Sequence, residues 1–395
     1  MVYRVNANPK MIRWARKDAG YKIEELPKYL ENVPKWESGE LQPTWEDLRK
    51  LAKKYKRPPV FYLRSEPPEI KKDNIEEFRS AERVAEKSPE LRLEIRKAKY
   101  RRNAFVNLHK EMGINLSNFS KNTIDTKNIK DFAEKIREIL DVSIDTQKEW
   151  IFNKNCKKQY NHSVFLDQWK ELVSYLGVLI FETEDVTEEE MSGLSLYYDN
   201  YPLILLNGKN THNRRIFTLI HELAHLMKVE STICDVDKYN KKEAFCNKVA
   251  AEVLVPSEIL NKTPLTTKTT VNDHESYEWT NRELSKLAHI FGVSKQTILL
   301  KLYDNKKTTI AFKNSMIKDL EEENEEFRRK KEERNKNSSG GGMSSIEKAK
   351  KYEGKTYSRF IINAYENNVI SSVTFMRYLN VSIDNIDALF DEVGY

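Results

Sequence analysis

Apolar positions in the middle of the chain follow two patterns, one typical of strands and one typical of helices. Short apolar runs bounded by turn-forming residues predict three strands. They are residues 177–181, 194–198 and 203–206. Asp199 and Asn200 are expected to form the hairpin turn between the last two. The next apolar run, residues 216–227, contains neither glycine nor proline and predicts a helix. A second helix is predicted over residues 241–255 and ends at Pro256.

Helical spacing of apolar residues dominates the remainder of the chain. The main segments with this spacing are residues 9–16, 23–26, 42–55, 90–113, 129–140, 165–176, 282–298 and 317–336. The sequence therefore predicts an α+β fold that is mostly helical, with a small sheet packed beside a pair of helices. Helical modules are expected at both ends of the chain.

The helix predicted over residues 216–227 contains the pentad His-Glu-Leu-Ala-His, from His221 to His225. At about 3.6 residues per turn, the two histidines stand on one face, where both imidazoles can bind one Zn²⁺ ion. Glu222 lies beside them and can take a proton from a water polarised by the metal, as in zinc peptidases. The same pentad also arises by chance in core helices, so a third ligand is needed to support a metal site.

Two carboxylates in the second helix are candidates for the third protein ligand of a catalytic zinc ion. Glu243 shares its helix face with Asn247 and two alanines, and small residues let this helix lie close to the histidines. Glu252 lies nine positions further along and points the opposite way, so only one carboxylate can face the metal. We choose Glu243 as the ligand, with Glu252 as the fallback, and expect Asn247 to support a ligand side chain.

Residues 217–226 (FTLIHELAHL) and 243–256 (EAFCNKVAAEVLVP) resemble the two helical motifs of the ImmA/IrrE family of zinc metallopeptidases. The residues that the resemblance implies as ligands of one Zn²⁺ per chain are His221, His225 and Glu243. It implies Glu222 as the catalytic residue. It also implies a narrow protein substrate, a helix-turn-helix repressor that is cut to derepress stress-response, toxin–antitoxin, mobile-element or phage-defence genes. In organisation, the likeness extends over residues 1–310.

The strands that precede the histidine helix suggest how a substrate is held. A small sheet beside the metal can bind an extended peptide along an edge through main-chain hydrogen bonds. The residues that we expect to contact the substrate are Leu203, Ile204, Leu205, Leu206 and Asn207. Gly193 either lets the backbone approach the substrate or is an ordinary turn glycine, and the sequence leaves both interpretations open.

The N-terminal helices are similar to a helix-turn-helix of the Xre/Cro repressor type, with a W-E-S-G turn at residues 36–39 and a following helix from Pro43. Such a module places its recognition helix in the major groove of DNA. Here residues 31–35 are too few for that helix, and Pro34 is expected to interrupt it. A weak DNA contact and a protein-docking role therefore both stay open, and no DNA-binding residue is assigned.

Several side chains near the two motifs have no single assigned role. Cys234 is interpreted as a small buried residue, with a redox-released block of the metal site as the alternative. The candidates for binding the oxyanion of the transition state are His212, Arg214, Arg215, His274 and His289. Residues 282–298 resemble a second helix-turn-helix, which we interpret as domain packing first and as a DNA contact second.

Composition narrows the class of protein only slightly. The net charge of +6 is too small to indicate a nucleic-acid partner, and the basic cluster at residues 96–102 is interpreted first as a solvated helix face. Three cysteines suit a reducing compartment rather than a disulfide framework. No apolar run approaches the roughly 18–20 residues of a membrane span, and the N-terminus has no apolar signal region. We therefore expect a cytoplasmic protein without a membrane partner.

The length of 395 residues and the shifts in composition predict several segments. They are a helix-turn-helix-like domain (1–68), a helical connecting region (69–160), a zinc-peptidase domain (161–310), a charged helix with a glycine-rich linker (311–342) and a small helical C-terminal module (343–395). The C-terminal module is interpreted as a docking or regulatory piece. The sequence makes no prediction of the oligomeric state.

Overall fold

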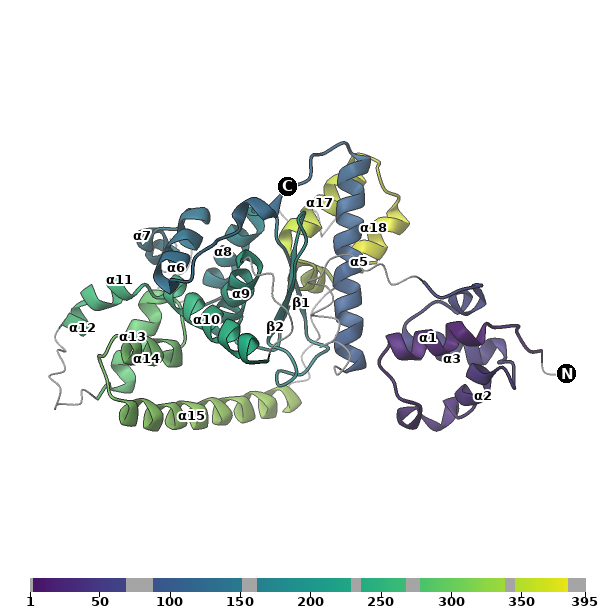
Figure 1. Cartoon of the computed structure of the whole chain (residues 1–395), viewed down its shortest axis with the longest axis horizontal. Helices are drawn as coiled ribbons and strands as arrows, with labels where there is room; N and C mark the ends of the chain where they lie inside the picture. The colour runs from purple at the N-terminus through teal and green to yellow at the C-terminus, as the bar shows by residue number, and fades with distance from the viewer. Residues whose placement is uncertain are drawn as a thin grey trace. The chain divides into compact units, whose positions relative to one another are not determined.

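The computed structural model of the chain describes residues 3–68, 88–150, 162–228, 236–267, 278–337 and 345–382. Its contacts divide the chain into two compact units. Unit 1 is Met1–Asn103 with Asp185–Glu190, and unit 2 is Ala104–Glu184 with Met191–Tyr395. The fold is α+β and mostly helical, as predicted, with one three-stranded sheet in the described part of the chain (Figure 1). No helix among these residues combines the length and apolar character that crossing a membrane requires.

Unit 1 is organised around three helices, α1 (Pro9–Asp18), α2 (Val33–Ser38) and α3 (Trp45–Tyr55). Its core is formed by apolar residues from all three, among them Met11, Ile12, Ala15, Val33, Trp36, Leu48 and Leu51. A buried ion pair joins α1 to α2, because Arg16 Nε donates to Glu37 Oε1 at 2.7 Å and Nη2 donates to Oε2 at 2.9 Å. The 3₁₀ turn η3 (Pro59–Leu63) adds Phe61 and Tyr62 to the same core.

Two details of unit 1 differ from the sequence prediction. The helix expected from residue 23 is only a three-residue 3₁₀ turn, η1 (Ile23–Glu25), because Leu26 is extended before Pro27. Pro34 does not interrupt a helix. It stands in the first turn of the six-residue α2, where its missing N–H leaves no hydrogen bond unmade. A second 3₁₀ turn, η2 (Lys28–Leu30), precedes α2, so this stretch contains no long recognition helix.

The basic cluster of helix α5 (Pro89–Glu111) does not form a purely solvated face. At the C-terminal end of α3, Arg96 donates to the main-chain carbonyl groups of Tyr55 and Lys56, at 3.2 Å each. It also donates to the Asp18 carboxylate at 3.0 Å. Arg92 donates to the carbonyl group of Lys17 at the end of α1, at 3.1 Å. Cations at the C-terminal ends of helices are favourable because the carbonyl dipoles point toward them. These two guanidinium groups therefore tie the part of α5 that belongs to unit 1 to α1 and α3.

Unit 2 contains the sheet, in the order β1-β3-β2. The strands are β1 (Leu179–Thr183), β2 (Gly193–Leu196) and β3 (Leu203–Asn207). The central strand β3 runs parallel to β1 and antiparallel to β2. The predicted hairpin is therefore present, but its connection spans residues 197–202 rather than a two-residue turn at Asp199 and Asn200.

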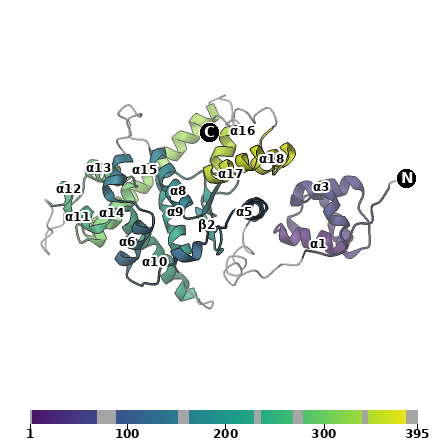
Figure 2. The same ribbon diagram turned by 90° about the horizontal axis from the view of Figure 1, so that it is seen from above.

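Helices and short helical turns make up the other described elements of unit 2. They are α6 (Ile129–Ile139), α7 (Ile144–Glu149), α8 (His162–Tyr175), α9 (His212–Met227), α10 (Val236–Leu254), α11 (Ser257–Lys262), α12 (Pro264–Thr267), α13 (Asn281–Phe291), α14 (Lys295–Asp304), α15 (Ile310–Asn337), α16 (Ser345–Lys348), α17 (Lys355–Glu366) and α18 (Ser372–Leu379), with the short turns η4 (Phe119–Asn122) and η6 (Ala349–Glu353). In Figure 2, α8 and α9 lie next to each other beside the sheet, and they are in contact.

Both faces of the sheet are covered, which explains why all five residues of β3 are buried. On one face, Glu182 of β1 forms ion pairs with Lys170 of α8 and with Arg215 of α9. Burial alone would raise the pKa of Glu182, but these two cations lower it below its ordinary value. On the other face, Phe181 packs edge-on against Tyr357 of α17, with ring centroids 5.6 Å apart.

The C-terminal module covers one edge of the sheet. The amide of Leu179 donates to the carbonyl group of Pro202, the residue just before β3. Main-chain groups alternate in direction along a strand, so those of the next residue, Ile180, point away from β3. Gly354 lies directly against this edge, where an added Cβ would be 2.3 Å from the carbonyl oxygen of Ile180. The Tyr352 hydroxyl donates to Glu184 at 2.8 Å just beyond the strand. Within the described residues, the open edge of the sheet therefore belongs to β2.

The second helix-turn-helix resemblance corresponds to α13 and α14, joined at Gly292, whose φ of +68° favours glycine. The apolar residues of both helices, Leu284, Leu287, Phe291, Ile298, Leu299 and Leu302, belong to the main core of unit 2. The predicted packing role of this segment is therefore confirmed. The N-terminal part of α15 joins the same core through Leu320, whereas residues 321–326, 329, 330 and 333 are exposed.

Candidate metal centre

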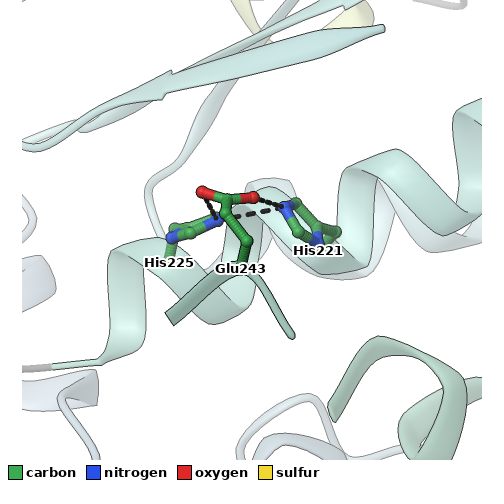
Figure 3. A group of neighbouring side chains, drawn as sticks. All are labelled: His221, His225 and Glu243. Carbon is green, nitrogen blue, oxygen red and sulfur yellow. Dashed lines mark hydrogen bonds and ion pairs between the residues drawn. The ribbon is translucent and has the colours of Figure 1, made fainter. Parts of the chain in front are cut away.

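The two histidines of the pentad lie on α9, as predicted. The helix starts at the N-cap residue Thr211, whose hydroxyl accepts from the amide of Arg214 at 3.3 Å. Ten of its sixteen residues are buried, so the surrounding core fixes the helix on several sides. His221 and His225 then stand one turn apart with their Nε2 atoms 3.0 Å from each other. Both Nε2 atoms point toward the same place (Figure 3).

The carboxylate of Glu243 on α10 completes this group. Its Oε2 lies 3.2 Å from His221 Nε2, and its Oε1 lies 3.3 Å from His225 Nε2. The three potential ligand atoms all lie within 4.8 Å of one another. Helices α9 and α10 pack closely, and the side of α10 that faces the core carries Ala250 and Cys246, both fully buried. Of the predicted face, Glu243 meets the histidines and Ala250 is buried, whereas Asn247 is exposed.

The geometry of this group is compatible with Zn²⁺. Bonds of about 2.0–2.1 Å in a tetrahedral site place neighbouring ligand atoms about 3.3–3.4 Å apart. The observed separations of 3.0, 3.2 and 3.3 Å are close to that value. Two imidazole nitrogens and one carboxylate are also the donor set of many catalytic zinc sites, which leave a fourth position for water or substrate. His221, His225 and Glu243 are therefore the residues that would hold the ion.

Nearby groups adjust the two imidazoles. Burial alone would lower the pKa of His221, but the Glu243 carboxylate, the charge of Glu222 and Asn247 together raise it. Nδ1 of His221 has no hydrogen-bond partner among the described residues, so the support expected from Asn247 stays a prediction. On the other ring, Nδ1 of His225 lies 3.6 Å from the sulfur of Cys246. Burial raises the pKa of this thiol to about 12, so it remains protonated near neutral pH.

Glu252 is not a ligand in this structure. Its carboxylate accepts from the amide of Ser257 at 2.8 Å and from the Ser257 hydroxyl at 2.7 Å, and it forms an ion pair with Lys301 of α14. Burial alone would raise the pKa of Glu252, but Lys301 and Ser257 lower it. The fallback ligand is therefore engaged in joining α10 to α14, and Glu243 alone of the two meets the histidines.

Glu222 is a buried carboxylate beside the metal centre, with 8% of its surface exposed. The hydroxyl of Ser195 on β2 donates to its Oε2 at 2.6 Å. The other oxygen, Oε1, forms no hydrogen bond within the described residues. The contact with Ser195 was not predicted, because the two residues are 27 positions apart and a lone serine in a strand carries no signal of its own.

The close approach of β2 to α9 requires Gly193. An added Cβ at this position would lie 2.4 Å from Cγ2 of Thr218 on α9. Gly193 and Ser195 share a strand face, because alternate residues of a strand point the same way. Gly193 is therefore not a turn glycine, because it lies in β2, and its missing side chain lets the strand pack against the histidine helix, a role that neither interpretation included.

We expect Gly193→Ala to destabilise the protein by about 1–3 kcal/mol, because the new methyl group overpacks the contact between β2 and α9. Thr218→Ser removes Cγ2 and keeps the hydroxyl, so the double variant should regain most of the loss caused by Gly193→Ala. Urea unfolding of the wild type, both single variants and the double variant measures this coupling. Equal stability of Gly193→Ala and the wild type would show that the contact is not tight.

The predicted substrate contacts at Leu203, Ile204, Leu205, Leu206 and Asn207 need correction. These residues form the central strand β3, which is paired on both sides, so their main-chain groups are not at an edge. Their side chains are buried, and the side-chain amide Nδ2 of Asn207 donates instead to the carbonyl group of Met191 at 2.9 Å. The continuous apolar run reflects burial on both faces of a sheet, not a substrate site.

The structure also separates the candidates for binding an oxyanion. Arg215 is buried and forms an ion pair with Glu182, so it is not placed to bind an oxyanion. Arg214 lies in the first turn of α9 and donates to the hydroxyl of Ser192 at 2.8 Å. His289 is exposed on α13. The remaining predictions that concern Cys234 and His274 fall outside the described residues.

Comparison with known protein families identifies a related domain in this chain. Residues 173–303 match the family model Peptidase_M78, described as the IrrE N-terminal-like domain. The matched segment contains the whole sheet, the pentad on α9 and the carboxylate of Glu243. No curated protein matches the chain. The match supports the ImmA/IrrE resemblance for this segment and does not extend to the N-terminal helices.

Proposed function

We propose that the chain is a zinc-dependent endopeptidase whose substrate is a cognate helix-turn-helix repressor, because residues 173–303 match the IrrE N-terminal-like domain of the Peptidase_M78 family. The observation that supports this activity best is the convergence of His221, His225 and Glu243 on one point, with Glu222 beside it. Cleavage of the repressor would derepress the genes that it controls, in a stress response, a toxin–antitoxin system or defence against mobile elements and phages.

The residues around the centre divide the chemistry between them. When bound by the two histidines and Glu243, Zn²⁺ supplies Lewis-acid polarisation. Glu222 takes a proton from the attacking water through Oε1, the oxygen that Ser195 leaves unbound, and passes it to the leaving amine. Because Glu222 is buried among protein atoms, its carboxylate acts in a surrounding of low polarity, where charges interact more strongly than in water.

The open edge of β2 is the place that suits an extended substrate. The main-chain amide of Asn207 donates to the carbonyl group of Ser192 at 2.9 Å, so the main-chain groups of Ser192 point toward β3. Main-chain groups alternate along an antiparallel strand, and those of Gly193 and Ser195 therefore point to the open edge. A peptide that pairs with this edge gains main-chain hydrogen bonds beside the metal centre. This edge replaces β3 as the proposed substrate contact.

The alternative function, a DNA-binding regulator or antitoxin-like partner with a structural metal, has less support. Residues 22–40 contain η1, η2 and α2, the stretch that resembles the helix-turn-helix. Its exposed charged residues are Lys22, Glu24, Glu25, Lys28, Glu31, Lys35 and Glu40. These three lysines and four glutamates give a net charge of −1, which does not favour a phosphate backbone. Exposed Tyr29 adds an apolar surface of the kind found in protein contacts.

A cleavage assay tests the proposed function directly. The full chain is purified with stoichiometric zinc and incubated with the proposed helix-turn-helix repressor substrate. We expect a single cut, located by mass spectrometry, that 1,10-phenanthroline abolishes and added Zn²⁺ restores. A DNA-binding regulator would instead show salt-sensitive operator binding that survives zinc removal, with no cleavage at any metal content. That result would overturn the peptidase proposal.

A further inference from the structure

We propose that Ser195 is a positioning residue for the general base, and that it links the substrate-binding edge of the sheet to Glu222. The inference rests on the proposed peptidase function, and it concerns a residue outside the two helical motifs. Ser195 Oγ donates to Glu222 Oε2 at 2.6 Å, the short distance typical of a hydroxyl that donates to a carboxylate. Among the described residues, Ser195 is the residue that donates a hydrogen bond to the Glu222 carboxylate.

The hydroxyl of Ser195 is held in place by the strand that carries it. β2 pairs with β3 at four successive positions, from Gly193 with Leu206 to Leu196 with Leu203. The missing side chain at Gly193 lets this part of β2 lie against α9, two residues before Ser195. The serine side chain therefore reaches the histidine helix from a fixed backbone rather than from a loop.

This contact separates the roles of the two carboxylate oxygens. Oε2 is anchored by Ser195, and Oε1 is left for the proton of the attacking water. A carboxylate without this anchor can rotate about its last bond, so only part of its population presents an oxygen in the right direction. Loss of alignment in a proton transfer lowers the rate of the chemical step and leaves binding of the substrate largely unchanged.

Ser195 also faces the substrate edge with its main chain. Its amide and carbonyl groups point to the open side of β2, away from β3, while its side chain points to Glu222. A peptide paired with this edge would hydrogen-bond to the same residue whose hydroxyl orients the base. The substrate would thus hold the strand in place at the moment when the position of Glu222 matters most.

A matched pair of variants isolates the hydroxyl. Ser195→Thr keeps it, and Ser195→Val replaces it by a methyl group of nearly the same size, while both β-branched residues suit a strand. The direct readout is the carboxyl ¹³C resonance of Glu222 in the metal-free full chain labelled with [5-¹³C]glutamate, assigned by its absence in Glu222→Gln. We expect this resonance to move in Ser195→Val and to stay near its wild-type position in Ser195→Thr. Identical spectra for the two variants would overturn the proposal.

Cleavage of the repressor by the zinc-loaded variants gives the functional readout. We expect Ser195→Val to lower kcat about tenfold with KM within about twofold of the wild type, and Ser195→Thr to retain most of the activity. Equal kcat values for the pair would show that the hydroxyl plays no part in positioning. If the wild type cleaves nothing, the peptidase proposal fails, whereas the resonance of Glu222 still decides whether Ser195 orients it. Zinc content measured on each variant excludes an effect through the metal.

Discussion

Glu222→Gln is expected to leave one zinc ion per chain bound while lowering the rate of repressor cleavage by about 10²–10⁴-fold. Glutamine matches glutamate in size and offers one oxygen to the hydroxyl of Ser195, so the local packing is kept. It cannot accept the proton of the attacking water, because its amide has no basic oxygen comparable to a carboxylate. Single-turnover cleavage with enzyme in excess measures the chemical step, and elemental analysis measures the zinc.

Glu252→Gln provides the matched control for this substitution. Both glutamates are partly or fully buried and both make hydrogen bonds to serine, but Glu252 lies beside Lys301 rather than beside the histidines. We expect Glu252→Gln to cut at nearly the wild-type rate. Should Glu222→Gln cut as fast as the wild type, Glu222 would not be the base, whatever the zinc content.

The second large effect concerns the metal itself. Glu243→Ala is expected to weaken zinc binding by more than about a hundredfold, because losing a direct ligand costs more than losing a residue that supports one. The two histidines remain, 3.0 Å apart at Nε2, but two ligands hold the ion less tightly than three. Competition with a fluorescent zinc chelator, followed for the wild type and the variant at the same pH, measures the change.

Glu252→Ala should behave in the opposite way. It is expected to keep zinc but to lower the free energy of unfolding by about 3–5 kcal/mol, because Lys301 is left buried without its carboxylate. The lowered pKa of Glu252 sets the pH range of this difference. The ion pair contributes fully above about pH 4.3, the ordinary value for glutamate, and the contribution is lost as pH falls through the lower folded value. Loss of zinc in Glu252→Ala instead would show that the ligand assignment is wrong.

The helical half of the centre could be predicted from the sequence because it depends on short-range geometry. The two histidines are four positions apart, and their helix repeat alone places them on one face. The choice of Glu243 over Glu252 followed from the small residues around it, which mark the side of α10 that packs closely. The structure brings together the same three side chains that this reasoning selected.

The strand half could not be predicted in the same way, because it depends on the order of strands in space. An apolar run such as Leu203–Asn207 shows that a strand is buried, but not that it lies between two others. Only the pairing register reveals that β2 has the open edge and that Ser195 points toward Glu222. Arg92 and Arg96 give a similar lesson, because carbonyl groups that accept hydrogen bonds leave no trace in a sequence.

The contact of Gly354 with the carbonyl oxygen of Ile180 has a consequence for the integrity of the chain. A bare outer strand offers unsatisfied donors and acceptors to any other extended polypeptide, and proteins commonly shield such strands to prevent aggregation. The residues just after η6 act as this shield for β1, and a bulkier residue than glycine would hold them off. Removal of the last fifty residues would therefore expose the edge of β1, on the side of the sheet away from the metal centre, and make the protein prone to aggregation even with every catalytic group in place.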